Sequence, residues 1–406
     1  MTTHADRPGL LEAAALAAEH LDTLVLEGVR DVHTSVSGRV HTVIDKVAGG
    51  PTQRPFLAHR IHDGIAAGVY AGIGLGLRGS ARALRAADRL GVGPDIDDSA
   101  RGRFVVSAVN GLIGDKLVAD GSPLAIETAV RVEGRDVPLT PEGLAAAYPD
   151  ASDAVVVFLH GLCETESYWD RHSRPKRKDG SSTESYGRRL AADEGWSPVF
   201  VRINTGVSIS ESGVALSSLL TRLVDSWPTD VRRIALVGHS MGGLTARAAC
   251  AVSLDIEEPW TAKVTDFVTL GAPHTGSPVE RSIARGIRLA AHAPELMPLA
   301  RVFEQRSVGV LDLHDGMPED TAALPNARYH LVAATLSRSP KHLVAGTVGD
   351  YLVQYRSAVG LLPGGVEMFP GADVLHVPCA HHFDLLNHDD VYAALRGWLA
   401  NETARS

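Results

Sequence analysis

The chain has 406 residues, of which 45% are hydrophobic and 21% charged, and its formal net charge is −9. This composition is typical of a globular protein and excludes a disordered chain, while the negative charge disfavours a general nucleic-acid binder. The three cysteines, Cys163, Cys250 and Cys379, are odd in number and widely spaced, so neither a disulfide framework nor a zinc site is predicted.

The first 115 residues carry helical signals only. Apolar periodicity predicts a helix over residues 8–32 and a second helical stretch over about 55–90. No secretory signal is predicted in the first 20 residues, so a cytoplasmic location is expected. We expect residues 1–115 to form a helical module that is separate from the chemistry.

Glycines spaced four apart lie in a charge-free part of the second stretch, at Gly64, Gly68, Gly72 and Gly76. This spacing predicts a close helix-helix contact, with a membrane-surface or oligomer contact as the alternative. Basic residues between 171 and 178 are expected to form a solvated loop, and attraction of an anionic lipid or substrate is the alternative.

Strand and helix signals alternate over residues 120–402. A leading antiparallel hairpin is predicted over 125–132 and 136–139. Further strands are predicted over 154–159, 198–203, 233–237, 264–270, 329–334 and 373–377, with helices over about 183–194, 211–227, 241–254 and 389–400. This alternation predicts an α/β fold with a mostly parallel central sheet flanked by helices, and a ligand site beyond the carboxyl ends of the strands.

The segment Gly238-His239-Ser240-Met241-Gly242-Gly243 lies between a predicted buried strand and a predicted helix. A serine in such a tight turn exposes its hydroxyl above the edge of the sheet, and the flanking glycines allow backbone segments to pass closely. Ser240 is therefore the candidate nucleophile.

The first parallel strand ends at His160-Gly161-Leu162. An oxyanion formed by serine attack needs backbone N–H donors from this loop and from the residue after the serine, which predicts Leu162 and Met241. Gly161 permits close approach of the backbone, and His160 is expected to buttress the loop. His160, Gly161 and His239 are expected to border the substrate.

Two adjacent histidines, His381 and His382, follow the last predicted strand, where a general base is required. His382 is favoured because Phe383 and the following leucines would anchor it, and His381 is the alternative. Asp350 is favoured as the orienting carboxylate because it follows the penultimate strand and precedes an apolar run. A solvated loop aspartate is the alternative role for Asp350.

Four blocks resemble the bacterial lipase and esterase branch of the α/β-hydrolases, including relatives of GPI inositol-deacylase. They are residues 158–162, 237–243, 270–277 and 382–387, and the resemblance covers about 120–402. It implies the α/β-hydrolase fold and a triad of Ser240, Asp350 and His382. The doubled histidine departs from the family pattern.

A long insertion over residues 278–327 predicts either a helical cap over the site or ordinary crossover helices. The leading hypothesis is a serine esterase or lipase that cleaves a small-molecule or lipid ester through an acyl-enzyme. No metal or organic cofactor and no nucleic acid are expected. The alternatives are an acyltransferase with the same triad and a non-catalytic binding protein.

Overall fold

The computed structural model describes Arg82 and residues 100–171, 173, 184–252, 257–276, 307–309, 312, 323–340 and 349–400. The chain divides into two compact units, Val106–Arg281 with Ser307–Ser406, and Met1–Val105 with Ser282–Arg306. The helix predicted over 8–32, the stretch predicted over 55–90 except Arg82, the four spaced glycines and most of the predicted cap lie outside the described residues. The division into a module at 1–115 and a domain at 120–402 stays a prediction.

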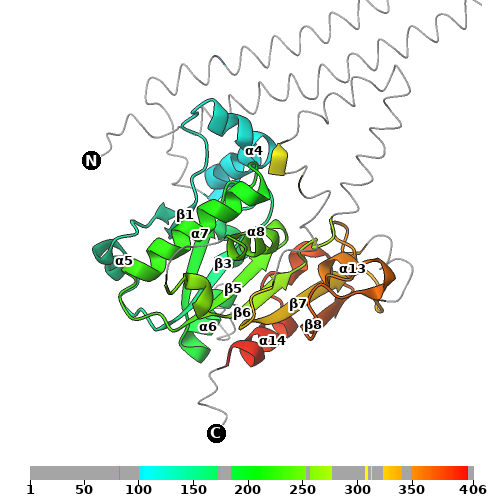
Figure 1. The fold of residues 1–406 in the computed structure, drawn as a ribbon. Coiled ribbons are helices and arrows are strands. Elements are labelled where there is room, and N and C mark those ends of the chain that lie inside the picture. Colours follow the sequence, from blue (N-terminus) through cyan, green and yellow to red (C-terminus); the bar gives the residue numbers. More distant parts are fainter. Residues whose placement is uncertain are drawn as a thin grey trace, which may run out of the picture. The chain divides into compact units, whose positions relative to one another are not determined.

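An eight-stranded sheet forms the centre of the first of these units, with the order β2-β1-β4-β3-β5-β6-β7-β8 (Figure 1). β1 pairs antiparallel with both β2 and β4, and the strands from β4 to β8 are parallel. The predicted leading hairpin and mostly parallel sheet are therefore confirmed. The bounds are β1 Ala129–Val132, β2 Arg135–Asp136, β3 Ala154–Leu159, β4 Ser197–Arg202, β5 Arg233–His239, β6 Val264–Leu270, β7 Arg328–Thr335 and β8 Asp373–Pro378.

β3 lies between β4 and β5 and is buried along its whole length. Its continuous apolar sequence forms a strand because the helices on both faces of a parallel sheet cover its side chains. In the pairing with β5, Leu159 lies opposite Gly238. The register therefore places the loop after β3 beside the turn after β5, where the candidate nucleophile lies.

Helices cover both faces of the sheet (Figure 1). α7 and α8 contribute to one buried apolar cluster, and α6 and α14 contribute to the cluster on the opposite face. Alternate residues of β3 belong to the two clusters, as the two-residue period of a strand requires. The helices are α5 Pro141–Ala147, α6 Tyr186–Glu194, α7 Ile209–Ser226, α8 Met241–Cys250, α13 Tyr355–Ala358 and α14 Asp389–Leu399.

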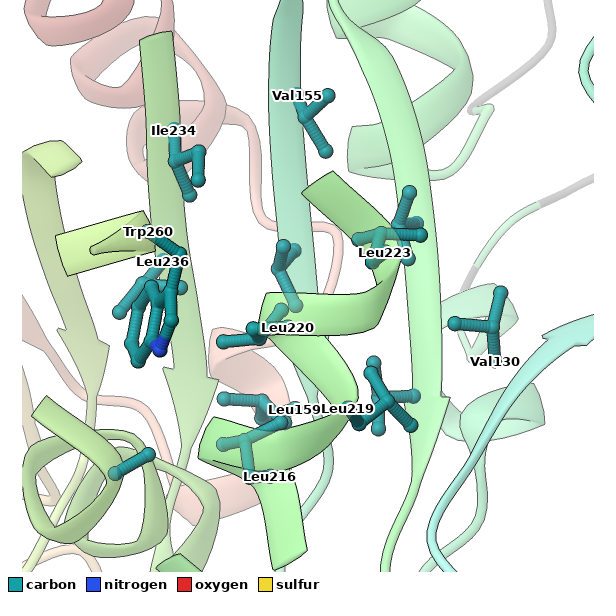
Figure 2. Close-up of a cluster of buried hydrophobic side chains, with 14 of the residues drawn as sticks. Val130, Val155, Leu159, Leu216, Leu219, Leu220, Leu223, Ile234, Leu236 and Trp260 are labelled. Atoms are coloured by element: carbon teal, nitrogen blue, oxygen red, sulfur yellow. The ribbon is translucent and has the colours of Figure 1, made fainter. Parts of the chain in front are cut away.

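α7 begins with a capping box in which Ser208 and Glu211 each accept a hydrogen bond from the other's backbone N–H. Figure 2 shows its leucines among side chains of the sheet and Trp260, in a cluster that includes Val155, Leu159, Leu216, Leu219, Leu220, Leu223, Ile234 and Leu236. Complete burial of each leucine contributes roughly 1.5–3 kcal/mol. This packing fixes α7 against β3 and β5.

A further helix, α4 Ala100–Ala119, was not predicted from the sequence. From Val106 onward it belongs to the unit that contains the sheet, where it buries Val106, Val109, Ile113 and Leu117. Asn110 Nδ2 donates to Leu124 O at 2.8 Å, and Ile126 N donates to Asn110 Oδ1 at 2.9 Å. In the described part of the chain, none of the helices combines the length and apolar character that crossing a membrane requires.

Candidate active site

Ser240 occupies a strained turn between β5 and α8, with φ 52° and ψ −125°. A residue with a side chain rarely adopts a positive φ, and such strain is found preferentially at functional positions. Ser240 N donates to Leu270 O at 2.9 Å, and Gly243 N donates to Ser240 O at 3.0 Å. These bonds hold the strained turn against β6 and the first turn of α8.

Glycine is required on both sides of the serine. A Cβ atom at Gly238 would lie 2.5 Å from Gly243 Cα, and one at Gly242 would lie 2.3 Å from Leu159 O. A side chain at either position would collide with backbone, so the close approach of α8 to β3 depends on these glycines. This is the elbow geometry that the sequence predicted.

The loop after β3 lies directly beside Ser240. A Cβ atom at Gly161 would lie 2.9 Å from Ser240 Cβ. The Leu162 side chain packs against an apolar cluster that contains Met241 and Leu244 of α8. The two residues predicted to supply oxyanion donors therefore belong to adjoining segments, and Met241 is the first residue of its helix, where backbone N–H groups have no partner within the helix.

His160 is fully buried beneath this loop. Its Nδ1 lies 3.0 Å from Gly161 O, and Ile203 N donates to its Nε2 at 3.1 Å. Burial lowers the pKa of His160, which favours the neutral ring that accepts from Ile203. Both ring nitrogens are thus engaged within the protein, as a buttressing role requires, and the expected substrate contact of His160 stays a prediction.

Asp350 and His382 form a buried pair at the same edge of the sheet. His382 Nδ1 lies 2.8 Å from Asp350 Oδ2, and the two side chains are 2% and 1% exposed. Leu352 N and Val353 N donate to Asp350 Oδ1 at 3.0 and 2.8 Å, which fixes the carboxylate. Among the described residues, Nε2 of His382 has no hydrogen-bond partner. The pair therefore orients an imidazole whose second nitrogen is free to exchange a proton.

The structure separates the two adjacent histidines. His381 is half exposed, and its Nδ1 lies 3.1 Å from Asp384 Oδ2 at the start of a short 3-10 helix, His382–Leu385. His382 instead lies against Gly271, where a Cβ atom would be 3.1 Å from its Nδ1 and Cε1. Of the two candidates for the general base, only His382 contacts Asp350.

His239 is also fully buried, and its ring centroid lies 4.7 Å from that of His382. Its Nδ1 lies 2.9 Å from Oε1 of Glu164, a buried residue that the sequence analysis missed. The ring packs between Glu164 and His382, and the expected substrate contact of His239 stays a prediction. The only local signal was the acidic residue just after the oxyanion loop, and its partner lies 75 positions away.

α4 supports the oxyanion loop from outside. Ser107 Oγ donates to Glu164 O, and Cys163 N, in the same loop, donates to Thr205 Oγ1 at 3.2 Å. Cys163 has φ 59°, another strained position for a residue with a side chain. The loop that is predicted to bind the oxyanion is thus held between α4 and the segment after β4.

Gly111→Ala in α4 is expected to destabilise the protein by about 1–3 kcal/mol, because a Cβ atom at Gly111 would lie 2.3 Å from Cys163 Sγ. The matched control is Gly397→Ala in α14, where a Cβ atom would meet nothing within 4 Å. That control should gain about 0.5–1 kcal/mol from helix propensity. Urea unfolding of both variants measures the two effects, and equal shifts in the same direction would contradict the packing of α4 on the loop.

The strand order, the antiparallel leading hairpin and the serine elbow after β5 define the α/β-hydrolase fold. Residues 213–301, which run from α7 through the elbow and β6, match the model of a family described as PGAP1-like alpha/beta domain. The chain therefore has the α/β-hydrolase fold, as the sequence motifs indicated, and the part from α7 to residue 301 is similar to this family. A comparison with curated protein sequences gives no match.

Several solved structures are similar to the chain. The mature lipase BlEst2 of Bacillus licheniformis is 20% identical, with 61% of this chain and 92% of that chain covered and a TM-score of 0.41. The Pyrococcus furiosus esterase Pf2001 is 15% identical (62% and 82% covered, TM-score 0.38), and EstA of Clostridium botulinum is 13% identical (62% and 88% covered, TM-score 0.39). Because these scores lie below 0.5, the fold assignment rests on the strand order and the elbow.

Proposed function

We propose that the protein is a serine hydrolase that cleaves carboxylic esters through an acyl-enzyme. The observation that carries the proposal is the buried Asp350–His382 pair at the same sheet edge as the strained Ser240 elbow. Nucleophile, acid and histidine follow the chain order of α/β-hydrolases. If the pair only stabilised the fold, we would expect Nε2 of His382 to form a hydrogen bond as well, yet it has no partner among the described residues.

In the proposed reaction, Nδ1–H of His382 donates a hydrogen bond to Asp350 and keeps its proton, so that Nε2 carries the lone pair. Nε2 removes the proton of Ser240 Oγ as the oxygen attacks the ester carbonyl, and later returns it to the alcohol that leaves. The N–H groups of Leu162 and Met241 stabilise the oxyanion. Water then repeats the sequence on the acyl-enzyme, with His382 as the base.

A small-molecule or lipid ester is the proposed substrate class, and the cytoplasmic location, the lipid-surface contact and the cap over residues 278–327 stay predictions. An acyltransferase would use the same acyl-enzyme and replace water by another alcohol. A non-catalytic binding protein has no need for Asp350 to be fixed by two backbone N–H donors.

A series of p-nitrophenyl esters of increasing acyl length tests the proposal. We expect measurable hydrolysis, with kcat/KM rising by up to about fourfold per methylene as long as the chain is buried, since each buried methylene contributes about 0.8 kcal/mol. Product analysis with added alcohols separates acyl transfer from hydrolysis. Absence of turnover with every ester would contradict the proposed function.

A further inference from the structure

The buried carboxylate of Glu164 connects two segments that adjoin Ser240. Gly161 N, in the oxyanion loop, donates to Glu164 Oε2 at 2.7 Å. The same oxygen lies 3.0 Å from Nδ1 of His239, the residue directly before Ser240. One side chain therefore links the oxyanion loop to the elbow.

His239 extends this link to the histidine loop, because its Nε2 lies 3.3 Å from the backbone O of His382. A carbonyl oxygen only accepts hydrogen bonds, so Nε2 is the donor to His382 O. The pKa of Glu164 is lowered by the facing His239 and the Gly161 N–H against the opposing effect of burial, and an ionised carboxylate also only accepts, so Nδ1 donates to it. An imidazole that donates from both nitrogens is an imidazolium. The contacts thus describe a buried His239–Glu164 ion pair.

The surroundings of the pair agree with this ionisation. Among the described residues, the charged and titratable groups near it are His382, Asp350, His160, Cys163 and Tyr168. The other rings that face His239 are Trp169 and Phe383. Burial alone lowers the pKa of His239, but the Glu164 carboxylate outweighs burial and the pKa is raised. Burial likewise raises the pKa of Glu164, and the facing His239 with the Gly161 N–H outweighs it, so that this pKa is lowered.

We propose that Glu164 and His239 act as one positioning unit, which holds the oxyanion loop, the elbow and the His382 backbone in register around Ser240. This inference rests on the proposed serine hydrolase function. The His239 ring packs against the His382 ring, but in that mechanism neither Glu164 nor His239 bonds to the substrate or transfers a proton, so both are positioning residues. Their loss should lower kcat and leave KM nearly unchanged, because the ground-state binding surface is kept while the reacting groups lose their alignment.

A second buried glutamate, Glu166, provides a matched control. It lies two positions later, and its Oε1 is 3.4 Å from Arg131 Nε. Arg131 also contacts Asp136 and Gly134 O in the leading hairpin. Glu166→Gln changes a buried carboxylate of the same segment whose ion-pair partner is Arg131, and it leaves the Gly161–Glu164–His239 hydrogen bonds in place, so it separates positioning from general destabilisation.

The kinetic test uses the full chain with Glu164→Gln, His239→Gln, the double variant and Glu166→Gln. We expect kcat and the rate of fluorophosphonate labelling of Ser240 to fall by about 10- to 100-fold in both single variants. The double variant should be no worse than the more impaired single one, because the two residues act as a unit. Glu166→Gln should keep the wild-type kcat even if its urea midpoint falls.

Selective 15N labelling of the histidines tests the ionisation directly. At about pH 8, above the ordinary histidine pKa, both ring nitrogens of His239 should be protonated in the wild type. The signal is assigned by its loss in His239→Gln, and one nitrogen should lose its proton in Glu164→Gln. If Glu164→Gln does not fold, the wild-type spectrum still shows whether both ring nitrogens of His239 are protonated, because His239→Gln assigns the signal.

The inference is wrong if His239 is neutral in the wild type, if Glu164→Gln keeps its kcat, or if Glu164→Gln and Glu166→Gln lose activity equally. Labelling of Ser240 that depends on Glu164, without turnover of any ester, would overturn the proposed function and support the positioning unit. Ester turnover that does not depend on Glu164 would overturn the positioning unit and support the proposed function. Failure of the wild type to label at Ser240 would overturn both.

Discussion

Replacement of Ser240 by alanine is expected to lower kcat for ester hydrolysis by roughly 10⁴- to 10⁶-fold, as for other triad losses. The hydroxyl is the only protein group in the proposed mechanism that forms a covalent bond to the acyl carbon. Stability should change little, because alanine and serine both place a Cβ atom at the strained φ of 52° and the backbone bonds of the elbow are kept. Steady-state kinetics, fluorophosphonate labelling and urea unfolding measure the three outcomes.

The matched control is Ser218→Ala, at an exposed position of α7 away from the sheet edge. This variant should keep wild-type turnover and wild-type labelling. Labelling of Ser240→Ala at the wild-type rate would show that another residue is the nucleophile.

The second large effect is expected from His382→Ala, with a loss of kcat of roughly 10⁴- to 10⁶-fold. The variant removes the imidazole that lies 2.8 Å from Asp350 and is proposed to carry the proton between Ser240 and the leaving alcohol. KM should change much less, because the proton transfer takes place only on the way to the transition state. Kinetics with a short-chain ester measure both constants.

His381→Ala is the adjacent control. It removes a half-exposed side chain whose partner is Asp384, so it should cost about 0.5–2 kcal/mol of stability through the lost cap and leave kcat within about threefold of the wild type. Equal and mild losses of kcat from both variants would mean that neither histidine is the base.

Most of the fold could be predicted from local sequence signals. The buried run 154–159 became β3, residues 264–270 became β6, and the predicted helix over 389–400 became α14 Asp389–Leu399. These predictions succeeded because a continuous apolar run, as in β3, and a short segment rich in β-branched and aromatic residues, as in β6, are typical of strands. A 3.6-residue period is typical of a surface helix. α4 was missed because its buried face contacts loops of the same unit and gives little apolar periodicity.

One part of the candidate site could likewise be predicted from local sequence signals, and another part could not. The elbow could be predicted because glycine, serine and the flanking strand and helix are local, and the order of nucleophile, acid and histidine is a property of the chain. Asp350 and His382 lie 32 positions apart, and the contact between them depends on the turn that fixes Asp350 and on the course of the chain after β8.

The sequence by itself determined the alternation of strands and helices and the turn that holds Ser240, and it indicated the proposed class of chemistry, because these depend on residue types within a few positions of one another. Only the tertiary structure decided which of His381 and His382 faces Asp350, since adjacent residues differ only in the direction that the folded backbone gives their side chains. It also decided the roles of Glu164 and His239, because their ionisation arises from burial and from partners that sequence spacing does not reveal.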